Sequence, residues 1–537
     1  MKYLKILLPI VVVAMLWACG ESGNDVPQGS TLHRGLSSDP ESLDPHKMRS
    51  VQAGEVLRDI GEGLASYSSI GELVPGAAES WMISEDGLTY TFKIRSAARW
   101  SNGDAVTAEH FAFSLRRLVD PATAAFNAHM IADVTNATEI SAGEKLPAEL
   151  AVDATDEHTL VITLSQPTPY FLSLLTYPST FPVHPESFAE HGDAFTRPGV
   201  LLSNGAYKLE AWQPGSVLTL SRNEQYWNNA ETAIDAVNHH VLTQEMTELN
   251  RYRAGEIHIT GAIPPDSFEQ VRKERPDEMH VAPYLGVYYY GYNLTKPPFK
   301  DGPQLRQALS MAIDREVLVE RVTGRGELPA YSWVPPGVDN YDPRRLSYAD
   351  LSQDERNTTA RRLYHEAGFG PDNPAQIELR YNTSDTQQRI ALAIQSMWRE
   401  VLGAEITLIN EEFQVLLANM REAEITEIFR SSWIGDYNDA HTFLNILQDG
   451  NPANMPRYSS AEFDGLMQRA AEQVDPMRRR LYLEEAERIL LADHPVIPLY
   501  FFVSKHLVSP EVIGWGDNVL DYHYSQHLSL ASDDATP

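Results

Sequence analysis

The sequence predicts an α/β protein of several domains, with mixed sheets flanked by helices. Its 537 residues exceed what one hydrophobic core usually organises, so two to four domains or lobes are expected. The first half is rich in alternating strands, and the second half alternates short apolar runs with helices. Neither an internal repeat nor a long low-complexity linker occurs, so the domains are expected to be joined by crossing strands.

Strands dominate the first half. In residues 86–95 the apolar positions recur at every second residue, at Leu88, Tyr90, Phe92 and Ile94. This alternation is typical of a half-buried antiparallel strand. Residues 159–164 repeat the pattern, residues 204–209 and 216–221 predict a hairpin, and a helix is expected at 53–64.

Helices and strands alternate in the second half. Pro303 opens a helix whose apolar residues are spaced three and four apart, and Gly324 can close it. Residues 385–403 predict a second helix, and residues 461–491 predict two more that are separated at Asp475 and Pro476. Strands are expected at residues 377–381, 405–409, 425–433 and 496–503. This order favours a mixed or parallel sheet with helices packed on it.

The first 18 residues have the form of a signal peptide. Lys2 and Lys5 precede an apolar run over residues 6–18, which is shorter than the roughly 20 residues of a spanning helix and contains Pro9. The run ends in Cys19, and residues 16–19 (Leu-Trp-Ala-Cys) resemble the bacterial lipobox, although the tryptophan is bulkier than usual. We therefore predict lipidation of Cys19, a polar tether over residues 19–29, and a place in the bacterial periplasm on a lipid anchor. An ordinary signal peptide with an incidental cysteine is the alternative.

The charge is strongly acidic. The formal charge of −31 becomes −33 when Lys2 and Lys5 are removed with the signal peptide. Such an excess argues against a nucleic-acid or anionic-lipid partner and favours solubility, and a monomer is expected. Cys19 is the only cysteine, so packed domains rather than disulfides must hold the exported chain together.

Catalytic signatures are missing from the sequence, so no enzyme, cofactor or metal is predicted. There is no phosphate loop, no nucleophile elbow and no His-Glu-x-x-His zinc helix. A calcium loop beginning at Asp436 is rejected because Ala440 takes the third ligand position. His239 and His240 are adjacent and would point to opposite faces of a strand, so we expect them to be isolated surface histidines.

Residues 428–443 are the stretch that most suggests a ligand site. An apolar run containing Arg430 gives way at Gly435 to a turn-rich segment with Asp436 and Asp439. Opposite charges at a strand end suit a zwitterion. Aromatic clusters beside polar turns, at residues 288–290, 433–437, 500–502 and 522–524, are expected to be mainly core, although tyrosine hydroxyls also suit a polar cleft.

Several segments together resemble the oligopeptide-binding proteins of ABC importers, an extracellular solute-binding family. They are residues 42–47, 99–108, 204–209, 250–257, 288–290, 381–385 and 433–438, in the family's order along nearly the whole mature chain. The resemblance implies a bilobal clamshell of three domains. Domain I would comprise residues 30–60, 184–285 and 503–537, domain II the inserted residues 61–183, and domain III, the opposing lobe, residues 286–502.

The resemblance also implies where a peptide binds. Asp436 of the Trp-x-x-Asp-Tyr motif would pair with the peptide's ammonium, and Arg430 would receive the C-terminal carboxylate of a short peptide. Six extended residues span at most about 20 Å and a tripeptide about 10 Å, so the two can bracket a short peptide. Mutual neutralisation of Arg430 and Asp436 is the alternative. The other expected ligand-binding residues are Trp433, Gly435, Tyr437, Tyr290, Gln387, Arg421 and Tyr500.

Three positions depart from the best-known relative. Gln387 stands in place of a histidine, and Gly291 and Arg49 each stand in place of a glutamate, so the preferred peptide length or side-chain charge is expected to differ. Peptide backbone hydrogen bonds and hydrated side-chain pockets would allow many sequences.

The function implied is a non-enzymatic receptor that closes on short peptides and delivers them to the subunits of an ABC permease. The alternative within the same fold is a binder of murein (cell-wall) peptides. A secreted peptidase and a surface adhesin or chaperone are hypotheses from other classes, and neither has a motif in its favour. Gly20 lacks the aspartate that often retains such lipoproteins at the inner membrane, and the choice of membrane stays open.

Overall fold

The computed structural model describes residues 30–423 and 427–531. The predicted signal peptide, the lipidation site at Cys19 and the tether lie outside these residues, as do residues 424–426 and 532–537. Within the described ranges, no helix is both long and apolar enough to span a membrane.

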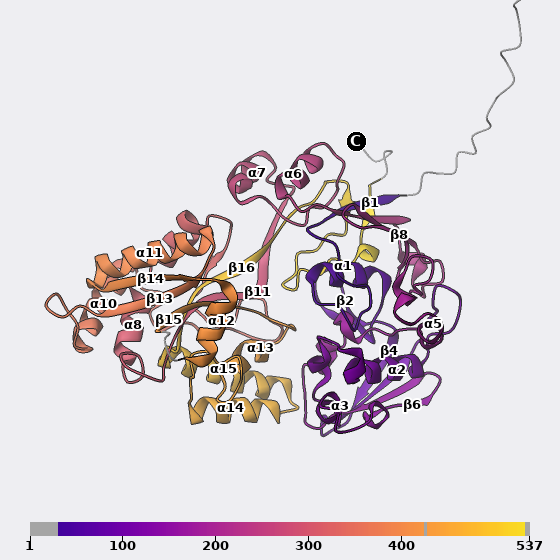
Figure 1. Ribbon diagram of the computed structural model, residues 1–537, viewed down its shortest axis with the longest axis horizontal. Coiled ribbons are helices and arrows are strands. Elements are labelled where there is room, and N and C mark those ends of the chain that lie inside the picture. The colour runs from indigo at the N-terminus through magenta and orange to yellow at the C-terminus, as the bar shows by residue number, and fades with distance from the viewer. Residues whose placement is uncertain (1–29, 424–426, 532–537) are drawn as a thin grey trace, which may run out of the picture.

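Two lobes lie side by side and are joined by two long strands, β11 (Met279–Tyr292) and β16 (Val496–Leu507) (Figure 1). We call residues 30–278 and 508–531 the N-terminal lobe, and residues 293–495 the second lobe. The N-terminal lobe contains the described part of both chain ends (Figure 1). The limits of the three domains given above stay a prediction.

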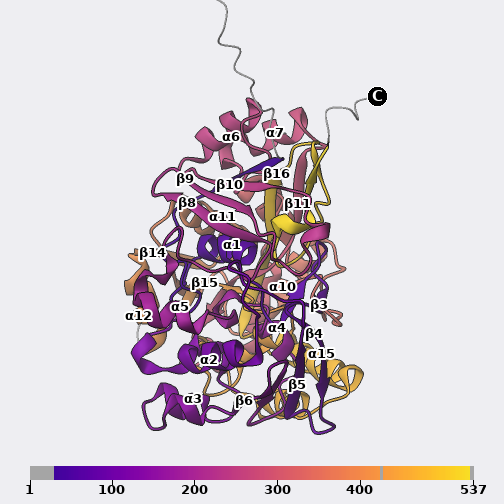
Figure 2. The same cartoon turned by 90° about the vertical axis from the view of Figure 1, so that its right-hand side faces the viewer.

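The N-terminal lobe is built on two antiparallel or mainly antiparallel sheets. One has the order β1-β10-β9-β8, in which β1 is parallel to β10, and the other has the order β4-β5-β7-β6. Figure 2 shows them at opposite ends of the lobe with α1 between them. The strands are β1 (Thr31–Leu36), β4 (Ala78–Ile83), β5 (Thr89–Ile94), β6 (Val152–Asp156), β7 (Thr159–Thr163), β8 (Tyr207–Gln213), β9 (Val217–Arg222) and β10 (Ala236–Val241).

Short strand pairs and helices complete this lobe. The pairs are β2 (Ala65–Tyr67) with β3 (Leu73–Pro75) and β17 (Val512–Ile513) with β18 (Ser529–Leu530). The helices are α1 (Val51–Ile60), α2 (Ala108–Val119), α3 (Ala137–Ser141), α4 (Phe171–Leu174), α5 (Pro185–His191), α6 (Glu245–Arg253) and α7 (Phe268–Glu274). Helix α2 packs against β6 and β7 and closes a core around Phe92 and Phe111.

The second lobe is organised by a mixed six-stranded sheet of order β12-β16-β11-β15-β13-β14. Its remaining strands are β12 (Leu328–Pro329), β13 (Gln376–Asn382), β14 (Glu405–Glu411) and β15 (Ile428–Ile434). Its helices are α8 (Pro303–Met311), α9 (Arg315–Val317), α10 (Gln353–Glu366), α11 (Asp385–Leu402), α12 (Phe413–Glu422), α13 (His441–Leu444), α14 (Ala461–Ala471) and α15 (Pro476–Asp493). Strand β13 is parallel to both β14 and β15, which confirms the predicted α/β class with mixed sheets.

The two connecting strands belong to both lobes. Residues 279–283 of β11 pair with 503–507 of β16, and Leu507 packs in a small core with α6 and α7. Residues 287–292 lie in the core of the second lobe. The pairing register shifts between Pro283 and Val287, where the strands pass from one lobe to the other. This interruption leaves fewer ladder hydrogen bonds at the crossing than within either lobe.

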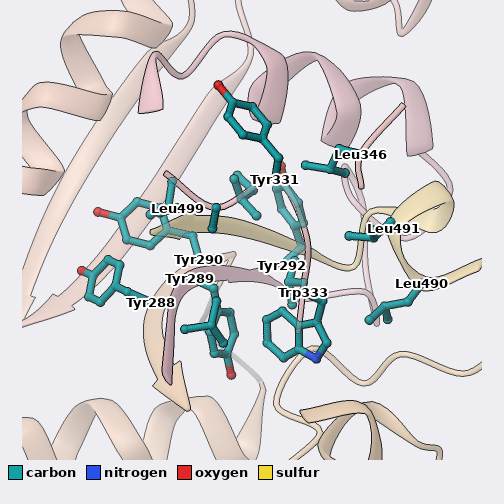
Figure 3. Close-up of a cluster of buried hydrophobic side chains, with 14 of the residues drawn as sticks. Tyr288, Tyr289, Tyr290, Tyr292, Tyr331, Trp333, Leu346, Leu490, Leu491 and Leu499 are labelled. Carbon is teal, nitrogen blue, oxygen red and sulfur yellow. The ribbon is translucent and has the colours of Figure 1, made fainter. Parts of the chain in front are cut away.

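Aromatic side chains fill the core beneath β11, as predicted for this cluster. Tyr288, Tyr289, Tyr290 and Tyr292 are all buried, and Figure 3 shows them beside Trp333 and Leu499. The Tyr289 ring meets Trp333 edge-on at 4.9 Å between ring centroids. Burying several large rings along one strand makes a large apolar contribution to stability.

Two sequence expectations are wrong in their details. The helix opened by Pro303 ends at Met311, because Asp314 accepts a hydrogen bond from the backbone N–H of Val317 at 2.9 Å and starts a new turn. His239 and His240 are not isolated surface residues. His239 is fully buried with Nε2 at 3.1 Å from Asp59, and His240 Nε2 lies 2.9 Å from Nδ1 of His33.

Candidate functional site

Asp436 lies in the loop after β15, facing the N-terminal lobe. Its side chain is reached by solvent, yet protein surrounds it on several sides, and this partial desolvation raises the pKa of its carboxyl while the nearby His129 opposes the rise. The charge of Asp436 in turn contributes to the raised pKa values of Tyr177 and Tyr522. All three of these neighbours belong to the N-terminal lobe, so Asp436 stands at the space between the lobes.

Arg430 lies on β15 directly opposite Tyr290 of β11. Its guanidinium carbon is 5.2 Å from the centre of the Tyr288 ring, a cation–π arrangement. Residues two apart on a strand share a face, so Tyr288, Tyr290 and Arg430 form one patch of the sheet. Nε of Arg430 and the hydroxyl of Tyr290 are buried and have no hydrogen-bond partner among the described residues.

Neither of the two charges is neutralised within the described part of the chain. No ion pair joins Arg430 or Asp436 to any described residue, and the only hydrogen bond at Asp436 is from its backbone N–H to Oγ1 of Thr442 at 3.4 Å. This argues against mutual neutralisation. The Asp436 side chain is exposed and the Arg430 guanidinium is half-buried, so both charges are available to a ligand with complementary charges.

The loop that carries Asp436 is held by close packing. A Cβ added at Gly435 would lie 3.1 Å from atoms of Phe443 and Thr442, and the Gly435 N–H donates to the Leu285 carbonyl at 2.8 Å. The indole N–H of Trp433 donates to Oγ1 of Thr442 at 3.3 Å. Glycine at position 435 therefore lets the chain turn against α13 and directs Asp436 away from the sheet.

Tyr437 makes a contact between the lobes. Its ring stacks on Tyr170 of the N-terminal lobe at 4.4 Å between centroids, and the Tyr437 hydroxyl lies 2.9 Å from Nδ1 of His441. Beside this contact is a pocket of about 200 Å³ lined by both lobes, including Tyr170, Asp439 and Arg479. The second aspartate of the predicted stretch, Asp439, forms a bidentate ion pair with Arg479 at 2.7 and 2.8 Å. Its charge is therefore already balanced within the protein.

Tyr500 and Gln387 adjoin the Arg430 patch. The buried ring of Tyr500 stacks parallel on Tyr288 with centroids 4.6 Å apart. The Tyr288 hydroxyl donates to Oε1 of Gln387, which lies in the first turn of α11. The structure thus brings together Tyr290, Gln387, Arg430 and Tyr500. Trp433, Gly435, Asp436 and Tyr437 form a second group at the other end of β15 and in the following loop.

Arg421 stands apart from both groups in its contacts. It lies in the last turn of α12 with an exposed side chain, and its backbone carbonyl accepts a hydrogen bond from Arg457. Among the described residues, no hydrogen bond, ion pair or cation–π contact joins its guanidinium to the Tyr288 patch.

The departures at Gly291 and Arg49 have local explanations. A Cβ at Gly291 would lie 2.3 Å from the Phe429 ring, so the ring occupies the space that a larger residue would need. The backbone N–H of Arg49 donates to Glu41, and its guanidinium lies 5.4 Å from the centre of the Phe126 ring. At position 291 the Phe429 ring fills the space that a glutamate side chain would need, and at position 49 a positive charge stands in place of a negative one.

Sequence reasoning missed the residues that the other lobe contributes. Tyr170, Tyr177, His129 and Tyr522 lie near Asp436 or its loop and come from three separate segments. Of these four, only Tyr522 belonged to a cluster that the sequence singled out, the aromatic residues 522–524. Arg479 was not singled out because its partner, Asp439, is 40 residues away.

These observations define a class of protein. Two lobes connected by paired strands, with a carboxylate of one lobe facing the other, are the architecture of a clamshell solute-binding protein. The chain belongs to the bacterial extracellular solute-binding proteins of family 5, whose middle-region model matches residues 72–455.

Similar proteins support this assignment to the family. The periplasmic oligopeptide-binding protein OppA of Escherichia coli K12 is 38% identical over 516 residues, which cover 94% of each chain. Among solved structures, the murein tripeptide-binding protein MppA in its unliganded open form has a TM-score of 0.88 at 35% identity and covers 95% of this chain and 100% of its own. The Haemophilus influenzae OppA complex with the peptide RPPGFSPFR has a TM-score of 0.73 at 34% identity and covers 94% and 99%. At nearly equal identity, the lobes here are arranged more like the open form than like the peptide complex.

Proposed function

We propose that this protein is the substrate-binding component of an ABC-type oligopeptide importer. It captures short peptides between its lobes and delivers them to permease subunits in the membrane, without catalysing a reaction. The observation that carries the proposal is that Asp436 and Arg430, on and just after one strand, form no ion pair with any residue that the structure describes. The family and the oligopeptide-binding relatives support it.

In this proposal Asp436 binds the peptide ammonium. Ammonium–carboxylate hydrogen bonds are stronger than neutral ones, and a closed cleft removes the water that would compete. Arg430, with Tyr290 and Gln387 beside it, receives the C-terminal carboxylate of a short peptide, and its unpaired Nε becomes a donor to that group. Trp433, Gly435 and Tyr437 shape the ammonium end of the cleft, Tyr500 lines its middle, and Arg421 approaches the carboxylate when the lobes close.

Closure is a rotation about the two connecting strands. The interrupted pairing between Pro283 and Val287 gives a place where the strands can bend with little loss of hydrogen bonding. The three-domain division predicted above is part of the same proposal. The receptor acts as a monomer in the periplasm and is held to a membrane by lipid at Cys19.

Titration calorimetry tests the ligand class. A tripeptide with free termini is expected to bind much more tightly than its N-acetylated form, because acetylation removes the cation that Asp436 holds. A murein tripeptide, whose linkage differs from that of an ordinary peptide, separates the main proposal from a murein receptor. Tighter binding of the murein tripeptide than of all ordinary tripeptides would reassign the protein to that function.

The affinity is expected to depend on pH through Asp436. Desolvation raises the pKa of its carboxyl above that of an ordinary aspartate, about 3.9. The ionised form binds the ammonium, so affinity is full at neutral pH and falls as the pH drops through this raised pKa. Calorimetry between pH 7 and pH 4 should show the loss beginning at a higher pH than the titration of a normal aspartate. An Asp436→Asn variant should show a flat profile over the upper part of this range.

Arg430 is expected to matter most for the shortest ligands. Removing its guanidinium by Arg430→Ala should weaken a tripeptide roughly 10- to 100-fold, since one charge-assisted pair contributes about 1.5–3 kcal/mol, and should change a nonapeptide little. Arg389→Ala, which removes an exposed arginine from α11, is the control. Equal losses of affinity for the tripeptide and the nonapeptide would show that Arg430 does not bind the C-terminal carboxylate.

A further inference from the structure

A cluster of two histidines and an aspartate lies where β16 enters the N-terminal lobe, beside Tyr522 but outside the residues proposed to bind the peptide. His506 is on β16, whereas Asp521 and His523 are in the segment that follows the second lobe-connecting strand toward the C-terminus. Among the described residues, these three form the group whose possible metal-binding atoms all lie within 4.8 Å of one another. No step of peptide binding uses it.

The distances suit a small cation. Nε2 of His506 and Nε2 of His523 lie 2.8 and 3.1 Å from the same Oδ1 of Asp521. In a tetrahedral zinc site with bonds of about 2.0–2.1 Å, neighbouring ligand atoms are about 3.3 Å apart, so each group needs to move by only a few tenths of an ångström. The Asp521 side chain is 28% exposed, which leaves room for a water as the fourth ligand.

A hydrogen bond to the protein backbone fixes the ring orientation of His506. Its Nδ1 lies 2.7 Å from the backbone carbonyl of Thr260, and a carbonyl can only accept a hydrogen bond. Nδ1 therefore carries a proton, and Nε2 lies 2.8 Å from Oδ1 of Asp521, a separation that requires either a proton or a metal ion between the two atoms. A histidine that donates one nitrogen to a carbonyl and directs the other inward is the usual arrangement behind a metal ligand.

The other two groups are also held in place. The His523 ring stacks on Trp515 with centroids 3.7 Å apart, and the His523 carbonyl accepts a hydrogen bond from Arg34 at 2.7 Å. Asn518 binds the backbone of Tyr522 at both ends, through bonds of 3.1 Å each, and so fixes the turn that contains Asp521. Three preoriented donors, two imidazoles and one carboxylate, favour Zn²⁺ and similar transition metals over Mg²⁺ or Ca²⁺, which prefer oxygen.

We propose that His506, Asp521 and His523 bind one divalent transition metal ion of the Zn²⁺ type, with water completing the site. The ion ties β16 to the segment that carries Tyr522. Tyr522 lies against Arg58, whose guanidinium carbon is 3.8 Å from the ring centre, and contributes to the wall that faces Asp436. The metal thus fastens the N-terminal-lobe end of a lobe-connecting strand.

The experiment uses the full mature chain without a histidine tag, stripped with a chelator and free of added peptide. Calorimetry with Zn²⁺ and elemental analysis after gel filtration should give one zinc per chain, and Mg²⁺ should give none. His523→Gln and Asp521→Asn should each weaken zinc at least about 100-fold. The His33→Gln variant is the matched control, because His33 and His240 form another close histidine pair, with ring nitrogens 2.9 Å apart.

Two further readouts keep the test decisive. Each metal-free variant should keep the circular dichroism spectrum of the metal-free parent, which shows that weaker zinc binding is not misfolding, and Co²⁺ in the parent should give the visible absorption of tetrahedral coordination. If a variant fails to fold, the other variant and the Co²⁺ spectrum decide. Absence of bound zinc, unchanged zinc affinity in both variants, or loss of zinc in His33→Gln instead would overturn the proposal.

Discussion

Asp436→Ala is expected to weaken binding of a free-amine tripeptide by about 30- to 1,000-fold and to leave the fold intact. Truncating one partner of a buried charge pair costs about 2–4 kcal/mol, because the other charge is left desolvated and unpaired. The Asp436 carboxylate has no hydrogen bond to a described residue in the open structure, so folding does not depend on it. Calorimetry measures the affinity, and circular dichroism with thermal unfolding checks the fold.

Asp372→Ala is the matched control for this result. Asp372 is exposed in the same lobe. Its substitution by alanine removes the same charge from the protein, so this control separates loss of the ammonium anchor from a change in overall electrostatics. The N-acetylated tripeptide adds a second test, since acetylation and Asp436→Ala remove the two halves of one pair and their effects should not add. Equal affinity of Asp436→Ala and the parent for the free-amine peptide would place the ligand elsewhere.

Arg479→Ala is expected to produce the largest loss of stability, about 3–5 kcal/mol. Arg479 and Asp439 are both largely shielded from solvent and meet through two hydrogen bonds, of 2.7 and 2.8 Å. Burial raises the pKa of Asp439, but the Arg479 charge outweighs it and holds the pKa below its ordinary value. Removing the arginine leaves a carboxylate buried without a counter-charge, and denaturant unfolding should report the loss.

The Asp439–Arg479 pair also predicts a pH effect. Because the folded pKa of Asp439 is lowered, its contribution is complete above the unfolded value, about 3.9, and is lost as the pH falls through the lower folded value. In Arg479→Ala this acid-dependent part of the stability should be absent. Arg478→Ala, an exposed neighbour in the first turn of α15, should change stability by less than about 0.5 kcal/mol. A similar loss in both variants would contradict a special role for the buried pair.

The elements that the sequence predicts well are those whose signal is local. The alternation in residues 86–95 becomes β5, and the break at Asp475 and Pro476 separates α14 from α15, because Asp475 caps the second helix. Periodicity and capping depend on residues within one or two turns of each other. The lipidation at Cys19 and the domain limits stay predictions.

The features that sequence reasoning could not supply depend on distant partners. His239 and His240 were expected at the surface, but Asp59 and His33 supply partners that allow the first to be fully buried. The Phe429 ring over Gly291 and the Tyr170–Tyr437 stack between the lobes likewise join segments far apart in sequence. The sequence does not show which of its 74 acidic residues stands between the lobes without an ion pair to a described residue, whereas the structure does so for Asp436.

The most direct test of the central claim is native mass spectrometry of the protein purified without unfolding, followed by release and identification of the bound ligands. The account predicts that the protein carries a mixture of short peptides with free amino termini. The same preparation of Asp436→Ala should carry far less of this mixture, while Asp372→Ala should carry as much as the parent. Recovery of only sugars, or of N-terminally blocked peptides in equal yield from the parent and Asp436→Ala, would contradict the account.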